Sequence, residues 1–199
     1  AVGTYTAYAA AVNDITGCEG PRTLVTLTID PLPSAPVGTD VTVCYDGSVH
    51  TASAAVNAGE TLVWYTTLTG TTITTAPSNT AVGTYTAYAA AVNDLTGCEG
   101  PRTLVTLSID LLPRVPVGTD LTVCYDGAVH TSFATPNAGE TIVWYDAATG
   151  GAVTTAPSNS AVGTYTAYAA AVNDLTGCEG PRTLVTLIID PLPSAPVKT

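Results

Sequence analysis

Apolar and polar residues alternate along several short stretches of this chain, most clearly in "RTLVTLSID" from Arg102. The alternation gives that stretch one apolar face and one mixed face: Val105, Leu107 and Ile109 against Leu104, Thr106 and Ser108. A period of two is typical of a strand that buries one face. We therefore predict a half-buried strand here.

Further short runs of β-branched and aromatic residues lie between turn signals: "DVTVCYDG", "SVHTASA", "TLVWYT", "TTITT" and "GTYTAYAAAV". The segment "AYAAAV" could also form a helical turn, but Gly83, Thr84 and Thr86 just before it favour a strand. Short strands at this spacing predict an all-β protein built as β-sandwiches, with about seven strands in each.

The pattern repeats with a period of 80 residues, because "AVGTYTAYAAAVND" begins at Ala1, Ala81 and Ala161. Proline-rich stretches such as "IDPLPSAPVGTD" favour extended backbone and are expected to be short linkers between domains. This divides the chain into an incomplete repeat at 1–32 (its last two strands), complete repeats at 36–112 and 116–192, and a linker at 193–199.

Charge and composition exclude several classes of function. The net charge is −11, with 5 Lys and Arg against 16 Asp and Glu, so a nucleic-acid partner would be repelled. No apolar run reaches the roughly 20 residues of a membrane-spanning helix, and we expect no insertion into a membrane. The absence of methionine, even at position 1, suggests a segment of a longer protein.

The order Cys44, Trp64, Tyr85, Tyr88 and then "GCEGPRTLVTL" around Cys98 resembles the Ig-like tandem repeats of large Bacteroidetes surface proteins, such as gliding-motility adhesins of the SprB type. The resemblance implies a location outside the cell, at the bacterial cell surface, with many tandem copies. It implies a structural segment of a secreted adhesin or surface filament, acting as a disulfide-stapled stalk in cell adhesion or gliding motility.

The five cysteines allow two regular pairings. Within repeats, Cys44 would join Cys98 and Cys124 would join Cys178, leaving Cys18 unpaired. Across linkers, Cys18 would join Cys44 and Cys98 would join Cys124, leaving Cys178 unpaired. The residues alone do not decide, but the resemblance favours pairing within repeats, and closing a loop of about 55 residues would stabilise each repeat by roughly 4 kcal/mol.

The remaining candidate sites are few. Trp64 and Trp144 are expected to be core aromatics, with the neighbouring tyrosines outside. Carboxylates near the repeat ends are candidates for calcium, the one cofactor considered: Asp46, Asp94, Glu99, Asp110 and Asp120. Arg102 and Arg182 are expected to form exposed pairs with Glu99 and Glu179. There is no CxxC or HxxxH motif for zinc.

No nucleophile with a basic partner is recognisable, so we do not expect an enzyme. The expected partners are neighbouring repeats of the same chain and other copies of it in a filament. Surface glycans are a third possibility, because Trp64 and Tyr65 could stack on a sugar. The alternative function is therefore a carbohydrate-binding Ig-like module of a secreted protein.

Overall fold

The computed structural model describes residues 1–195, which form strands and turns and, within that range, no helix. The chain divides into two compact units. The first contains residues 1–41, 49–80 and 84–108, and the second contains residues 42–48, 81–83 and the described chain from 109 onward. Among the described residues, nothing has the length and hydrophobicity of a membrane-crossing helix. The last four residues of the expected linker at 193–199 lie outside the described part.

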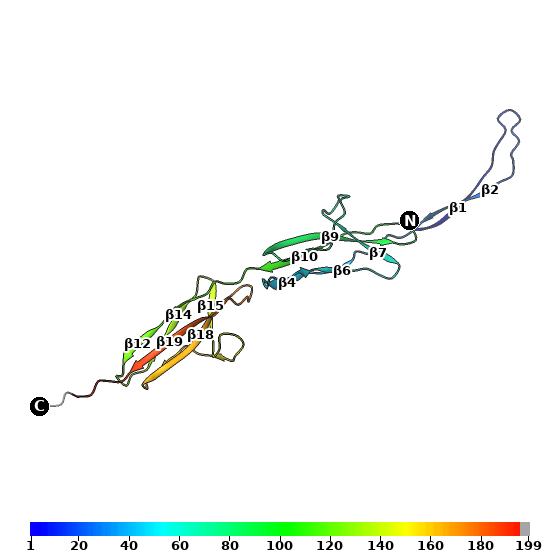
Figure 1. Ribbon diagram of the computed structural model, residues 1–199. Helices are drawn as coiled ribbons and strands as arrows, with labels where there is room; N and C mark the ends of the chain where they lie inside the picture. Colours follow the sequence, from blue (N-terminus) through cyan, green and yellow to red (C-terminus); the bar gives the residue numbers. More distant parts are fainter. Residues whose placement is uncertain (196–199) are drawn as a thin grey trace. The chain divides into compact units, whose positions relative to one another are not determined.

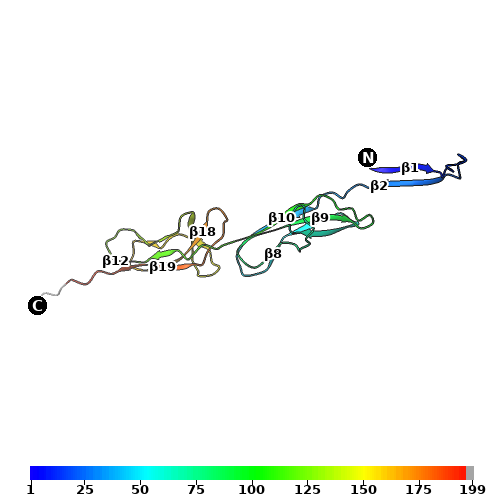
Figure 2. The same ribbon diagram turned by 90° about the horizontal axis from the view of Figure 1, so that it is seen from above.

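Residues 1–32 form a hairpin of two antiparallel strands, β1 (Gly3–Ala9) and β2 (Thr23–Ile29), shown in Figure 2. The register runs from Gly3 opposite Ile29 to Ala9 opposite Thr23. Apolar side chains on this hairpin are exposed, because no second layer in the described part of the chain covers them: Val25 and Leu27 keep 53% and 58% of their surface exposed.

The first complete repeat contains the strands β3 (Val37–Thr39), β4 (Val41–Cys44), β5 (His50–Thr51), β6 (Ser53–Ala55), β7 (Glu60–Tyr65), β8 (Ser78–Asn79), β9 (Gly83–Asn93) and β10 (Thr103–Asp110). One layer is a sheet in the order β4-β10-β9-β7. Figure 1 labels the four strands of this sheet. The short pairs β3-β6 and β5-β8 lie outside it.

The second complete repeat has the same plan, with the strands β11 (Val117–Thr119), β12 (Leu121–Cys124), β13 (His130–Thr131), β14 (Phe133–Thr135), β15 (Glu140–Tyr145), β16 (Val153–Thr154), β17 (Ser158–Asn159), β18 (Gly163–Asn173) and β19 (Thr183–Asp190). Its sheet runs β12-β19-β18-β15-β16, and β11-β14 and β13-β17 are the short pairs. The fold is therefore all-β, with tandem Ig-like domains.

The second strand of the second repeat, β12, runs parallel to the last strand, β19. β12 pairs with β19 from Leu121 opposite Leu187 to Cys124 opposite Asp190. β18 pairs with β19 and with β15 in antiparallel fashion. The parallel pair places the end of β12 beside the end of β19, far from the β18–β19 turn.

The predicted alternation on β10 is confirmed, since Val105, Leu107 and Ile109 are buried whereas Leu104 is exposed. The alanine-rich segment is part of strand β9, as predicted, and Ala89, Ala90 and Ala91 are fully buried there. Small side chains on β9 suit a strand that is covered on both faces.

Two predicted strands are shorter than expected. "SVHTASA" is interrupted at Ala52, whose N–H donates to the carbonyl of Pro77, so that β5 and β6 pair with different partners. "TTITT" contributes only an isolated bridge between Tyr65 and Ile73. In the second repeat the corresponding segment forms the two-residue strand β16.

The prolines expected in free linkers are instead partly built into the domains. Pro33, Pro36, Pro113 and Pro116 are buried. Pro33 lies against Gly100 so closely that a Cβ on this glycine would collide with the Pro33 carbonyl. The chain between the end of β10 and the buried Pro113 is therefore only Leu111 and Leu112.

Candidate functional site: the cysteine hairpin

The turn between β9 and β10 carries the motif "NDLTGCEGPR" and is shaped by its own polar groups. The side-chain oxygen of Asn93 accepts hydrogen bonds from the N–H groups of Leu95 and Thr96, at 3.0 and 2.9 Å. Gly97 has a φ of 69°, which favours glycine, and its N–H donates to the Asn93 carbonyl. These contacts fix the main chain just before Cys98.

Glu99 and Arg102, which follow Cys98 in this turn, form a cluster with Tyr65 at the end of strand β7. The Tyr65 hydroxyl donates to Glu99 Oε2 at 2.6 Å, and Arg102 Nε donates to Glu99 Oε1 at 2.9 Å. The Arg102 guanidinium lies over the Tyr65 ring, 3.3 Å from its centroid. We call Tyr65, Glu99 and Arg102 the Tyr-Glu-Arg cluster.

Arg102 also holds the loop that follows β7. Its Nη1 donates to the carbonyls of Thr67 and Gly70, at 3.0 and 2.6 Å. The guanidinium thus satisfies two main-chain acceptors, a carboxylate and the face of an aromatic ring at once. The cluster therefore joins the cysteine turn to the last residue of β7 and to the loop that follows β7.

The cluster changes the ionisation of its members. The hydrogen bond that Tyr65 donates to Glu99 raises the pKa of the tyrosine, with burial and the Glu99 charge acting in the same direction and Arg102 acting against them. Burial alone would raise the pKa of Glu99. The hydrogen bonds from Tyr65 and Arg102, with the Arg102 charge, outweigh burial and lower the pKa of Glu99.

The second repeat contains the same cluster, with Tyr145, Glu179 and Arg182. The hairpin at 1–32 has only the ion pair of Arg22 with Glu19, at 2.6 Å and well exposed. The sequence indicated the Arg-Glu pairs but placed them on the surface, whereas the Arg102 side chain is 13% exposed. The tyrosine was missed because it lies 34 residues before the glutamate.

The expected roles of the neighbouring aromatics need correction. Trp64 lies opposite the buried Ala89, on the core face of β7, but it is only partly buried. Tyr65, expected outside, is the more buried residue at 8% exposure, because Arg102 covers its ring. In the second repeat, Trp144 and Tyr145 are both partly buried.

The cysteines pair differently from either expected arrangement. Cys44 is bonded to Cys178, with 5.5 Å between their Cα atoms. Both belong to the second compact unit, which includes residues 42–48. Cys18, Cys98 and Cys124 are free thiols, and Cys18 and Cys124 are exposed.

The fold explains why pairing within a repeat fails. Cys124 lies beside Asp190, at the end of β19, whereas Cys178 lies in the turn before Thr183, where β19 begins. The seven residue steps of β19 span about 23 Å. A disulfide needs Cα atoms closer than about 7 Å, so Cys124 and Cys178 cannot bond. In the first repeat, the Tyr45 N–H donates to the Asp110 carbonyl and places Cys44 at the same end.

The carboxylates considered as calcium ligands are found in separate roles. Asp46 accepts a hydrogen bond from the amide two residues later, Asp94 from a threonine hydroxyl of β7, and Asp120 from an amide of β19. Glu99 is in the Tyr-Glu-Arg cluster, and Asp110 offers its carbonyl to β4's end. Within residues 1–195, no three His, Cys, Asp or Glu side chains gather as a metal site would require.

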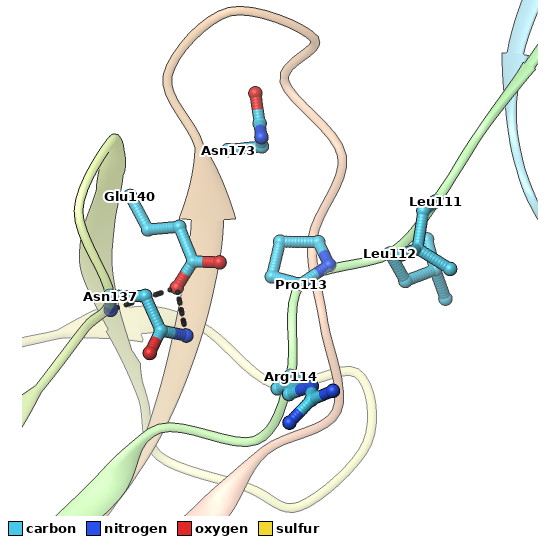
Figure 3. Close-up of a pocket in the computed structure, with 7 residues that line it drawn as sticks. All are labelled: Leu111, Leu112, Pro113, Arg114, Asn137, Glu140 and Asn173. Carbon is cyan, nitrogen blue, oxygen red and sulfur yellow. Dashed lines mark hydrogen bonds between the residues drawn. The ribbon is translucent and has the colours of Figure 1, made fainter.

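A pocket of about 330 Å³ lies in the second unit, lined by Leu111, Leu112, Pro113, Arg114, Asn137, Glu140 and Asn173 (Figure 3). Glu140 Oε2 accepts hydrogen bonds from the main-chain and side-chain nitrogens of Asn137, at 3.0 and 3.1 Å. Arg114 has Ser34 as its counterpart in the first repeat. The pocket therefore combines amide, carboxylate and guanidinium groups that could bind hydroxyls.

Solved structures similar to this chain include Ig-domain proteins and cadherins, all at TM-scores below 0.5. Extracellular domains 3–5 of Drosophila OTK match 95% of this chain and 71% of theirs, at 14% identity and a TM-score of 0.41. An I-band fragment of titin matches 78% and 64%, at 12% identity and a TM-score of 0.37. The Ig1-2 module of the Drosophila receptor tyrosine phosphatase DLAR matches 77% and 96%, at 15% identity and a TM-score of 0.27. Likenesses this distant carry no argument about function.

No curated protein matches the sequence. The profile of the family described as "Ig-like domain CHU_C associated" matches residues 33–110 and again residues 113–191. These two ranges cover most of the chain and coincide with the two layered repeats. The chain therefore belongs to the family of CHU_C-associated Ig-like domains, of which it contains two in tandem.

Proposed function

We propose that the chain is a stalk segment of an extracellular bacterial adhesin or surface filament, of the kind used for attachment or gliding. Repeats 36–112 and 116–192 are the structural units. Residues 1–32 are the closing hairpin of a preceding unit. The repeats are spacers that hold a binding or anchoring part away from the cell surface.

The observation that supports this proposal is how little chain separates the repeats. β10 ends at Asp110, and Pro113 is already buried in the second repeat. A connection of two residues between folded domains leaves little slack, so each added repeat should add a fixed length. The described carboxylates, cysteines and histidines do not gather as metal sites, and each repeat uses its charged cluster to fasten its own strands.

The proposal is tested by the dependence of particle length on repeat number. Chain 1–199 would be compared with a chain that carries one more copy of residues 113–192, by small-angle scattering and electron microscopy. A maximum dimension that grows by one domain length per repeat supports a stalk. Particles that become thicker at constant length would contradict it.

A second candidate function is glycan binding, and the pocket beside Arg114 favours it. The amide, carboxylate and guanidinium groups that line the pocket are the kinds that recognise sugar hydroxyls. Screening chain 1–199 against a glycan array, with Arg114→Ser as the matched variant, tests this function. Binding that Arg114→Ser loses would support a role in glycan binding. If chain 1–199 binds no glycan on the array, this second function is contradicted and the stalk function is retained.

A further inference from the structure

The spacing of the one disulfide is set by the repeat. Cys44 and Cys178 are 134 positions apart, which is the 80-residue period plus the 54 residues that separate "VCYDG" from "GCEG" in one repeat. The bond therefore joins the "VCYDG" cysteine of one repeat to the "GCEG" cysteine of the next. Both complete repeats contain the two motifs at the same spacing, so the same bond could join any repeat to the one that follows it.

Each free cysteine of the two complete repeats lies 80 residues from a bonded cysteine, at the same position of the other repeat. Cys98 is the counterpart of Cys178, and Cys124 is the counterpart of Cys44. Cys178 is 1% exposed, whereas Cys98 is only partly buried. Cys44 is partly buried, whereas Cys124 is exposed. Each bonded cysteine is thus better covered than its unbonded counterpart in an almost identical sequence.

The unbonded cysteines cannot form a disulfide within their own repeat. The parallel pairing of the first and last long strands keeps the two cysteine motifs at opposite ends of the sheet. The partner of Cys124 under the same rule would lie in a following repeat. The partner of Cys98 would lie in a preceding repeat, and that of Cys18 one repeat earlier still.

We propose that Cys44–Cys178 is one link of a disulfide ladder that joins each repeat to the next along a longer array. Cys98 and Cys124 are the positions at which the preceding and following links form. The motif "NDLTGCEGPR" is then a docking turn, and its asparagine and glycine contacts present the cysteine to the preceding repeat. The inference rests on the bond and the repeat period, and it holds whether or not the array is a stalk.

Formation of each link is an oxidation by two electrons. Both cysteine S–H bonds break and one S–S bond forms, and two protons and two electrons pass to the disulfide of a thiol oxidase, which becomes a dithiol. Such oxidants act outside the cytoplasm, where disulfides persist. Under this chemistry the two terminal repeats of an array each keep one unlinked cysteine motif.

The count of free thiols distinguishes the ladder from both pairings expected from the sequence. Of the five cysteines in chain 1–199, the ladder leaves three free after oxidation, whereas either alternative would leave one. A thiol assay on the denatured, oxidised protein makes this measurement. Three free thiols are expected, and a count of one or five would overturn the proposal.

Trypsin digestion distinguishes the ladder from pairing within repeats. Cleavage after Arg22, Arg102 and Arg114 leaves Cys44 with Cys98 in one fragment, and Cys124 with Cys178 in another. The ladder joins these two fragments by one disulfide, so mass spectrometry without reductant should detect them as one species with their combined mass. Fragments that stay separate, each closed on itself, would show pairing within repeats and overturn the ladder.

Two matched variants locate the bond. Cys178→Ser should release the two fragments and raise the free thiols from three to four. Cys98→Ser changes the same motif one repeat earlier and should keep the fragments joined, with two free thiols left. Loss of the link in Cys98→Ser would assign the bond elsewhere and contradict the proposal.

An added repeat tests whether the link propagates. Appending a further copy of residues 113–192 adds two cysteines, and the ladder predicts that one more bond forms, between Cys124 and the "GCEG" cysteine of the added copy. The number of free thiols should therefore remain three. An increase to five would show that the bond in chain 1–199 is an isolated feature and not a link that repeats.

Discussion

At the scale of single residues, Arg102 holds together four groups of the first repeat, as its counterpart Arg182 does in the second. It contacts the Glu99 carboxylate, the face of Tyr65 and the carbonyls of Thr67 and Gly70. The "GCEGPR" motif revealed the arginine and the glutamate, because they are three residues apart. The tyrosine and the two carbonyls come from a distant strand and its loop, and no local pattern marks them.

Replacing Arg102 with alanine should destabilise the first repeat by about 2 to 3 kcal/mol, because Glu99 is left partly buried without its ion pair and two carbonyls lose their donor. Urea unfolding of chain 1–199 measures the change. Arg22→Ala is the matched control: it removes the same ion pair without a tyrosine partner, and because this pair is exposed the variant should lose much less stability than Arg102→Ala. Equal effects of the two variants would contradict the role given to Tyr65.

The lowered pKa of Glu99 predicts how the cluster responds to acid. A carboxyl whose pKa is lower in the folded state stabilises the fold above its unfolded pKa of about 4.3, and this contribution disappears as the pH falls through the folded pKa. The difference in unfolding free energy between the wild type and Glu99→Gln should therefore be largest above about pH 5 and shrink below about pH 4. Urea unfolding across this pH range measures it, and a constant difference would contradict the cluster's electrostatics.

At the scale of strands, the sequence predicts which side chains share a face but not which faces are covered. Val25 and Val105 occupy the same place in the repeat, and their strands alternate alike. Val105 is fully buried, because the second layer brings Gly38 against it, whereas Val25 is about half exposed on the hairpin. The strand faces could be predicted from local periodicity, but burial depends on partners far along the chain.

The same limit explains the error in the disulfide prediction. Alternation and turn signals place the two cysteine motifs on strands and turns, but they do not say that β12 runs parallel to β19. That one pairing puts the motifs of a repeat about 23 Å apart and excludes the expected bond. Topology of this kind is set by long-range contacts and has no signature in a short stretch of sequence.

Glycine in the "CEGPR" motif provides an element-scale test of how each domain begins. Gly100→Ala should destabilise the first repeat by about 1 to 3 kcal/mol, because the new methyl group would collide with the Pro33 carbonyl that packs there. Gly20→Ala is the control at the same place in the motif, where the nearest atom is 3.6 Å away. Thermal unfolding should separate the two variants, and an unchanged midpoint for Gly100→Ala would mean that Pro33 is not anchored on the turn.

At the scale of the whole molecule, the disulfide changes which part of the chain carries a load. A force applied at the two ends passes from Cys44 directly to Cys178 when they are bonded, so the residues between them cannot be stretched. Both repeats contribute residues to this protected segment. A chain that serves as a stalk would gain most from a bond placed in this way.

Single-molecule pulling of chain 1–199 from its ends should therefore depend strongly on reduction. Breaking the bond frees the segment of 134 residue steps, which adds roughly 450 Å of extended chain. Bonds within each repeat would instead hide two loops of 54 residues, or roughly 370 Å, and would be released one by one. The Cys98→Ser variant should behave like the wild type, and Cys178→Ser should extend fully without reductant. Equal extension of the oxidised and reduced wild type would show that the bond does not bear load.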